Sequence, residues 1–322
     1  MKLNSNNISS HKYHHISYNR ILPRYNPNFG SSNLFISSNP HTDKAFETSK
    51  KLLNEMQNRI LSVIDMGKIS GVETKILPPF YSSVSAYTSF KPDFLNGTLS
   101  SPIIVTPLLE RQDKIGKTIY IMCFAHELTH KYQIDNKEDP LSQMFKDTVD
   151  AGFKLREIDN DFEKFTRFYQ QNVEGELMKM TIHKLLGNEG LEEYRETGGM
   201  VFSDTIINET QISNALGYKD KEDFISNFVE DNVPFDGIVE TICTRNPILA
   251  RKCVDSPTQI KSKIKTILIK YFRNSMQSEK EARLTETKIA NLQNFDDKVS
   301  KCTHLYYAMA EEAFEHYLQN SK

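Results

Sequence analysis

The sequence predicts an α+β fold that is mainly helical, with a small antiparallel or mixed sheet upstream of a central helix and a helical C-terminal region. Two observations predict it. Short segments rich in β-branched and aromatic residues, separated by Pro, Gly and Asn, fall between residues 72 and 109. From residue 114 onward, apolar residues recur at spacings of three and four, which is typical of amphipathic helices.

The chain has 322 residues, of which 38 % are hydrophobic and 25 % charged, so it is long enough for one large domain or two. Residues 1–42 are rich in Ser, Asn, Pro and His and show no periodicity, which indicates a disordered tail that could act as an export signal. We expect residues 43–190 to form the catalytic domain and residues 191–322 a helical C-terminal region.

The expected elements of the first half follow from local patterns. Apolar residues at helical spacing predict a helix from Asp43 to about Met66. Strands are predicted at Val72–Leu77, Val84–Phe90 and Ile103–Leu109, with a hairpin turn at the Asn-Gly pair of residues 96–97. A helix is then expected from Lys114 to about Gln133.

The second half reads as an array of helices. Residues 145–186 are expected to be mostly helical, in one or two pieces, and Gly187 is a plausible helix stop. Ser256 and Pro257 form a good N-cap and first-turn pair for a further helix. Residues 279–292 and 299–318 indicate two final helices.

Composition excludes several classes of function. The formal charge of -2 and the pI of about 6.5 give no reason to expect binding to nucleic acid or to an anionic membrane. No stretch approaches the roughly 18 apolar residues of a membrane span. The four cysteines form no CxxC pair, so we expect reduced thiols rather than disulfides or a cysteine zinc site.

The segment 126–130 reads His-Glu-Leu-Thr-His and lies within the expected helix 114–133. Histidines four residues apart share one face of a helix, where both can bind one metal ion, and zinc is the ion that this pattern favours. Glu127 points about 100° away from His126, where it can act as general base on a water molecule. The apolar residues of the helix lie on the side opposite to His126 and His130, so a later helix is expected to cover the histidines and bring a third ligand.

The third ligand is predicted to come from a second helix. A ligand delivered by the same segment would need a glycine at position 133 and a histidine at position 136, where this chain has Gln133 and Asn136. The segment 172–177 offers Glu174, which we predict to be the ligand, and Glu176. Because the two carboxylates point about 200° apart on an undistorted helix, only one can bind, and the helical wheel leaves Glu176 open as an alternative ligand or as a partner of a zinc histidine.

These residues resemble the HExxH zincin superfamily of metallopeptidases, and its glutamate-zincin (gluzincin) branch in particular. The resemblance covers about residues 43–190 and rests on FAHELTHKYQ and NVEGELMKM. It implies His126, His130 and Glu174 as zinc ligands and Glu127 as the base. The usual gluzincin motif has Asn before the glutamate and Asp four residues after it, whereas this chain has Val173 and Met178.

The order of elements also looks like zinc endopeptidases that pathogenic bacteria inject into host cells. That resemblance implies secretion without a classical signal peptide, into the host cytosol, and a host protein as substrate. Without secretion, we expect the protein to be cytoplasmic. The expected function is therefore zinc-dependent hydrolysis of peptide bonds in a protein substrate, which could pair with the strand at Ile103–Thr106. The alternatives are a catalytically inactive zincin-like protein and a helical partner-binding protein.

Overall fold

The computed structural model describes residues 113–136, 139–154, 171–197, 199–202 and 206–320, scattered positions between residues 44 and 60, and the backbone of five short strands between residues 74 and 105. The expected tail at residues 1–42 and most of the expected helix at residues 43–66 lie outside these residues. Predictions for those two segments therefore stay predictions.

The first group of helices lies between residues 114 and 197 and includes the segment 126–130. It comprises α2 (Lys114–Asp135), α3 (Pro140–Asp150), the π-helix η2 (Gln171–Leu177) and α5 (Met178–Thr197). Helix α2 begins at Asp113, whose carboxylate accepts a hydrogen bond of 2.8 Å from the Gly116 N–H. The prediction of a helix at residues 114–133 is confirmed. Gly187, predicted as a stop, is a kink with φ of 61°, after which the helix resumes.

The second group of helices builds the rest of the molecule. It comprises α6 (Glu209–Leu216), α7 (Lys221–Asn232), α8 (Phe235–Arg245), α9 (Pro247–Asp255), α10 (Pro257–Leu292) and α11 (Lys298–Asn320). Pro257 occupies the first turn of α10, as predicted. The helix expected after Ser256 and the one expected at residues 279–292 are a single helix of 36 residues. The segment contains no residue that would end the helix, because Gly and Pro are absent between Pro257 and Leu292.

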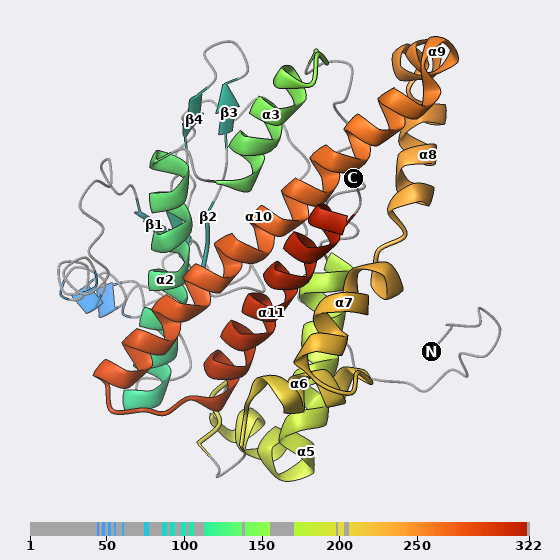
Figure 1. Ribbon diagram of the computed structural model, residues 1–322. Coiled ribbons are helices and arrows are strands. Elements are labelled where there is room, and N and C mark those ends of the chain that lie inside the picture. The colour runs from blue at the N-terminus through green and yellow to red at the C-terminus, as the bar shows by residue number, and fades with distance from the viewer. Residues whose placement is uncertain are drawn as a thin grey trace.

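Helix α10 is the central helix in the packing of the described residues. It runs alongside α11 over much of its length and crosses α2 near its C-terminal end (Figure 1). The described residues form two apolar clusters. The larger one joins α7, α8, the first half of α10 and α11, whereas the smaller one joins α2 to Met200, Ile289 and Ala290.

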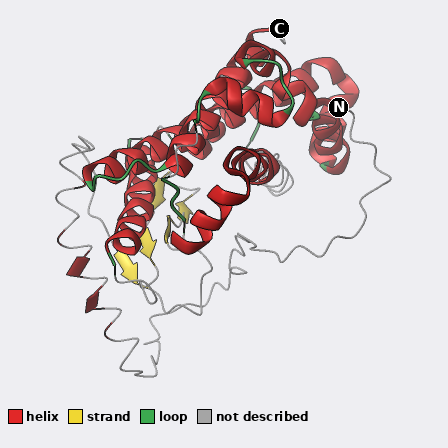
Figure 2. Ribbon diagram, turned by 90° about the horizontal axis from the view of Figure 1, so that it is seen from below, coloured by secondary structure: helices red, strands yellow, loops and turns green. Residues whose placement is uncertain are grey.

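Five strands of three residues each precede α2: β1 (Thr74–Ile76), β2 (Ala86–Thr88), β3 (Lys91–Asp93), β4 (Thr98–Ser100) and β5 (Ile103–Val105). Three of them form a sheet of order β1-β5-β2, in which β1 is parallel and β2 antiparallel to β5. Strands β3 and β4 pair with each other in antiparallel fashion. Strands β2 and β5 contact α2. In Figure 2 the strands are the yellow arrows close to the helices.

The predicted α+β fold class is wrong, and the molecule is all-α. Wherever the structure places side chains, the chain is helical or forms the loops between helices. Both apolar clusters consist of residues from helices and from those loops, so no strand contributes to the described core. Strands of three residues are shorter than the usual five or so. The β-branched pattern at residues 72–109 predicts a sheet as part of the domain, whereas helices build the core of the described residues.

Two further expectations concern the described residues. None of the four cysteines forms a disulfide, in agreement with the prediction. Among the described helices, none combines the length and the apolar character that crossing a membrane requires.

Candidate metal centre

Helix α2 is buried on two opposite sides. Its apolar side, with Ile121, Phe124 and Leu128, lies in the smaller cluster. The other side carries His126 and His130 and is covered by the C-terminal half of α10. The prediction that a later helix covers the two histidines is thus confirmed.

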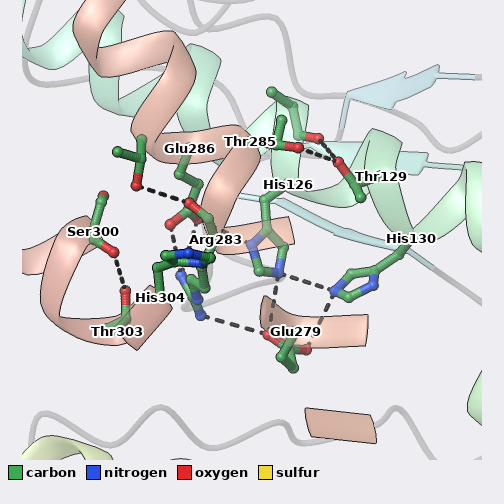
Figure 3. Close-up of polar contacts among 12 residues, drawn as sticks. His126, Thr129, His130, Glu279, Arg283, Thr285, Glu286, Ser300, Thr303 and His304 are labelled. Carbon is green, nitrogen blue, oxygen red and sulfur yellow. Dashed lines mark hydrogen bonds and ion pairs between the residues drawn. The ribbon is translucent and has the colours of Figure 1, made fainter. Parts of the chain in front are cut away.

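The two histidines and Glu279 of α10 point toward one another (Figure 3). The Nε2 atoms of His126 and His130 are 3.0 Å apart. The Oε1 atom of Glu279 lies 3.2 Å from His130 Nε2, and its Oε2 atom lies 3.6 Å from His126 Nε2. One ligand atom from each of the three side chains falls within 4.8 Å of the others, so this group can hold a metal ion.

Burial and charge distinguish this cluster from a surface ion pair. The whole residues His126 and Glu279 are only 6 % and 9 % exposed. Burial alone would lower the pKa of His130, but the charge and the hydrogen bond of Glu279 outweigh it, with a further contribution from Glu127. Together they raise the pKa of His130 from 6.5 to about 9. Burial would raise the pKa of Glu279, but the two histidines and Arg283 hold it well below its usual value.

A second carboxylate of α10 lies behind His126. The Oε1 atom of Glu286 is 3.1 Å from His126 Nδ1, on the side of the ring away from Glu279. Arg283 holds this carboxylate through contacts of 2.9 and 3.0 Å from its Nη1 atom, and its Nη2 atom lies 3.9 Å from Glu279 Oε2. Burial would raise the pKa of Glu286, but Arg283 and His126 lower it. Both carboxylates therefore stay ionised beside the histidines.

His130 has polar neighbours behind its ring as well. Its Nδ1 atom lies 3.0 Å from Gln133 Oε1 and 3.2 Å from Ser278 Oγ. Each imidazole thus turns Nε2 toward the centre and Nδ1 toward a polar group of its surroundings, which is how metal-bound histidines are commonly held.

Glu127, the predicted base, is 9 % exposed and follows His126 on α2. Its carboxylate is near enough to His130 to help raise the pKa of that side chain. It is not one of the three side chains that can share an ion, which agrees with a role other than that of a ligand.

The two predicted third ligands lie on η2. The side chain of Glu174 lies outside the described residues, so its assignment stays a prediction. Glu176 is exposed on the surface and forms an ion pair of 3.3 Å with Lys179. It does not belong to the group of His126, His130 and Glu279. Within the described residues, the carboxylate that meets both histidines is Glu279.

Sequence reasoning missed Glu279, although it placed the residue in a helix. The available signal was that Glu279, Arg283 and Glu286 share one face of α10, at spacings of four and seven residues. Helix faces with such charges are usually solvated, and no local pattern relates this face to the histidines about 150 positions earlier.

The donor set fits zinc. Two histidines and one glutamate are a common ligand set of catalytic zinc, and two ligands of a tetrahedral zinc ion lie about 3.3 Å apart. The Nε2 atoms are already at 3.0 Å, so only a small widening would be needed. Three protein ligands leave a fourth position for water or substrate.

Comparison of the chain with family models, with curated proteins and with solved structures finds no match, so the assignment of function depends on the chemistry of this cluster.

Proposed function

We propose that this protein is a zinc-dependent endopeptidase, with His126, His130 and Glu279 as zinc ligands and Glu127 as general base. The observation that supports it most is the meeting of both histidines of an HExxH segment with a buried carboxylate from another helix. The geometry favours Glu279 over the predicted Glu174 because Glu279 is the described carboxylate that reaches both Nε2 atoms.

In the proposed reaction, the zinc ion and the side chains would have separate roles. A bound zinc ion would polarise a peptide carbonyl and lower the pKa of a water molecule to about 7. Glu127 would accept a proton from that water and return it to the leaving amine. Arg283 balances one of the two buried negative charges of Glu279 and Glu286. A bound cation could balance the other in place of a protonated His130.

A second function has one observation in its favour. The three ligands are largely buried between α2 and α10, as they would be if the ion only joined the two helices. Such a protein would bind metal without cutting peptides, in agreement with the alternative of an inactive zincin-like protein. The open fourth position of a three-ligand site favours catalysis over this alternative.

The test is hydrolysis of an unstructured protein substrate by zinc-loaded protein and by Glu127→Gln. The variant removes the base and leaves the ligands, so it should keep its zinc and lose about 10²–10⁴-fold in rate. Glu222→Gln, which makes the same change at an exposed position on α7, is the matched control and should retain full activity. Full activity of Glu127→Gln, or absence of hydrolysis by the zinc-loaded wild type, would contradict the peptidase proposal.

The identity of the substrate as a host protein and the export of the protein from a bacterium stay predictions. They depend on the N-terminal 42 residues and on the resemblance given above, and no described contact of the metal centre tests either.

A further inference from the structure

Metal binding through Nε2 requires a particular state of each histidine. A neutral imidazole carries one proton, and a nitrogen that binds a metal must be free of it. The Nε2 atoms of His126 and His130 face each other and Glu279, so they are the atoms that would bind the ion. When they do, the one proton of each neutral ring must reside on Nδ1. The groups that contact Nδ1 therefore decide whether each ring is ready to bind.

At His130 the deciding group is the side-chain amide of Gln133, which is 2 % exposed. Its Nε2 atom lies 3.2 Å from the carbonyl oxygen of Ser278 and 2.8 Å from Oε2 of Glu281. Both of these groups only accept hydrogen bonds when the carboxylate is ionised, so the NH₂ end of the amide must face them. The opposite orientation would place the amide oxygen against two acceptors.

The orientation of this amide decides which ring nitrogen of His130 carries the proton. With its NH₂ end toward α10, Gln133 presents Oε1 to His130 Nδ1 at 3.0 Å. An amide oxygen can only accept, so Nδ1 must donate and Nε2 keeps its lone pair. The structure assigns Gln133 as a positioning residue that holds His130 in the tautomer able to bind metal. This inference rests on the proposed metal centre.

Ser278 makes the assignment testable. Its hydroxyl donates to Gln133 Oε1 over 2.6 Å, and its Oγ atom is also 3.2 Å from His130 Nδ1. Without the amide oxygen, the hydroxyl loses this acceptor, and His130 Nδ1 at 3.2 Å is the other group described in contact with it. It would then donate to Nδ1, move the ring proton to Nε2 and oppose metal binding.

The histidine pair is not symmetric in this respect. Glu286 approaches His126 Nδ1 to 3.1 Å, but that nitrogen has no well-aligned hydrogen bond. His130, by contrast, has an aligned acceptor whose own donors are both engaged. Gln133 therefore fixes the tautomer of His130 more firmly than Glu286 fixes that of His126.

The experiment compares the affinity of metal-stripped protein for Zn²⁺ and Co²⁺ by competition with a chromophoric chelator. Gln133→Met keeps the side-chain length and removes the acceptor, and it should bind about 10–100-fold more weakly than wild type. Ser278→Ala alone removes the 3.2 Å contact with His130 Nδ1 but leaves the Gln133 acceptor in place, so its loss of affinity should be smaller than that of Gln133→Met. Gln143→Met on α3 is the matched control and should change nothing.

The double variant separates positioning from support of the fold. Gln133→Met with Ser278→Ala removes the competing donor, so it should bind more tightly than Gln133→Met alone. If Gln133 only filled space, the second truncation would weaken binding further. A double variant weaker than the single one, or a Gln133→Met variant with wild-type affinity, would overturn the inference.

Two results keep this inference distinct from the proposed function. Absence of stoichiometric binding by the wild type would overturn the metal centre and this inference with it, whereas wild-type binding with an unaffected Gln133→Met would overturn this inference alone. Should Gln133→Met fail to fold, ¹⁵N NMR of histidine-labelled, zinc-loaded wild type gives the answer. The ring proton of His130 should be on Nδ1, and a proton on Nε2 would overturn the inference.

Discussion

The two halves of α10 contact their neighbours through opposite chemistry. In the first half, Leu268 and Phe272 are fully buried among aromatic residues of α7, α8 and α11. In the second half, Glu279 and Glu286 are buried against the histidines of α2. Burial of apolar side chains stabilises the first half, whereas the second half also holds buried charges whose desolvation must be offset by partners. One helix therefore combines a structural half with a half built to hold a cation.

The largest expected effect comes from the apolar half. Phe272 stacks on Phe314 with ring centroids 5.7 Å apart and contacts Phe235 edge-on. Phe272→Ala leaves a cavity there and should reduce the free energy of unfolding by about 3–5 kcal/mol, as measured by urea denaturation. The folded variant should bind zinc with wild-type affinity. Loss of zinc binding by a variant that is still folded would show that the two halves are not separate.

The polar half is tested by removal of its carboxylate. Glu279→Ala should lower zinc affinity by more than about 100-fold, beyond the 10–100-fold range for residues that only support a ligand. Glu176→Ala, at an exposed position, is the control and should bind zinc normally. Glu174→Ala should do so as well. Normal zinc content in Glu279→Ala together with zinc loss in Glu174→Ala would restore the prediction made from the sequence.

Zinc should stabilise the fold through the polar half alone. At a free zinc concentration of 100 times Kd, the free energy of unfolding should rise by about 2.7 kcal/mol. The same increase is expected for Phe272→Ala, whose damage lies in the other half, and less than about 0.4 kcal/mol for Glu279→Ala. Thermal unfolding with and without zinc measures it. An equal zinc effect in Glu279→Ala would place the ion elsewhere.

A further expected effect is a pH dependence of the stability of the metal-free protein. Glu279 raises the pKa of His130 from 6.5 to about 9, so the protonated ring stabilises the folded state fully below pH 6.5. This stabilisation should be lost as the pH rises through 9. Urea denaturation between pH 6.5 and 9.5 measures the loss, which Glu279→Gln should reduce. A metal-free wild type whose stability rises over this range would contradict the assigned pair.

The sequence predicted the metal helix well because its signals are local. The N-terminal boundary of α2, the shared face of His126 and His130, and the need for a covering helix all follow from helical periodicity. The third ligand could not be predicted in this way. Glu279 meets the histidines only because α10 crosses α2, and the relative placement of two distant helices leaves no periodic trace in either.

The prediction of the fold class was wrong for a related reason. Residues 72–109 carry real turn and strand signals, but periodicity does not reveal how much of the core a segment will build. The absence of Gly and Pro from residues 258–292 was the stronger signal, since it indicates one long helix around which a helical core can form.

The central claim is that His126, His130 and Glu279 bind one zinc ion. Crystals of the zinc-loaded protein, measured just above and just below the zinc absorption edge, test it most directly. The account predicts one anomalous peak within about 2.0–2.2 Å of both Nε2 atoms and of a Glu279 carboxylate oxygen. A peak bound to Glu174 in place of Glu279, or no peak between α2 and α10, would contradict it.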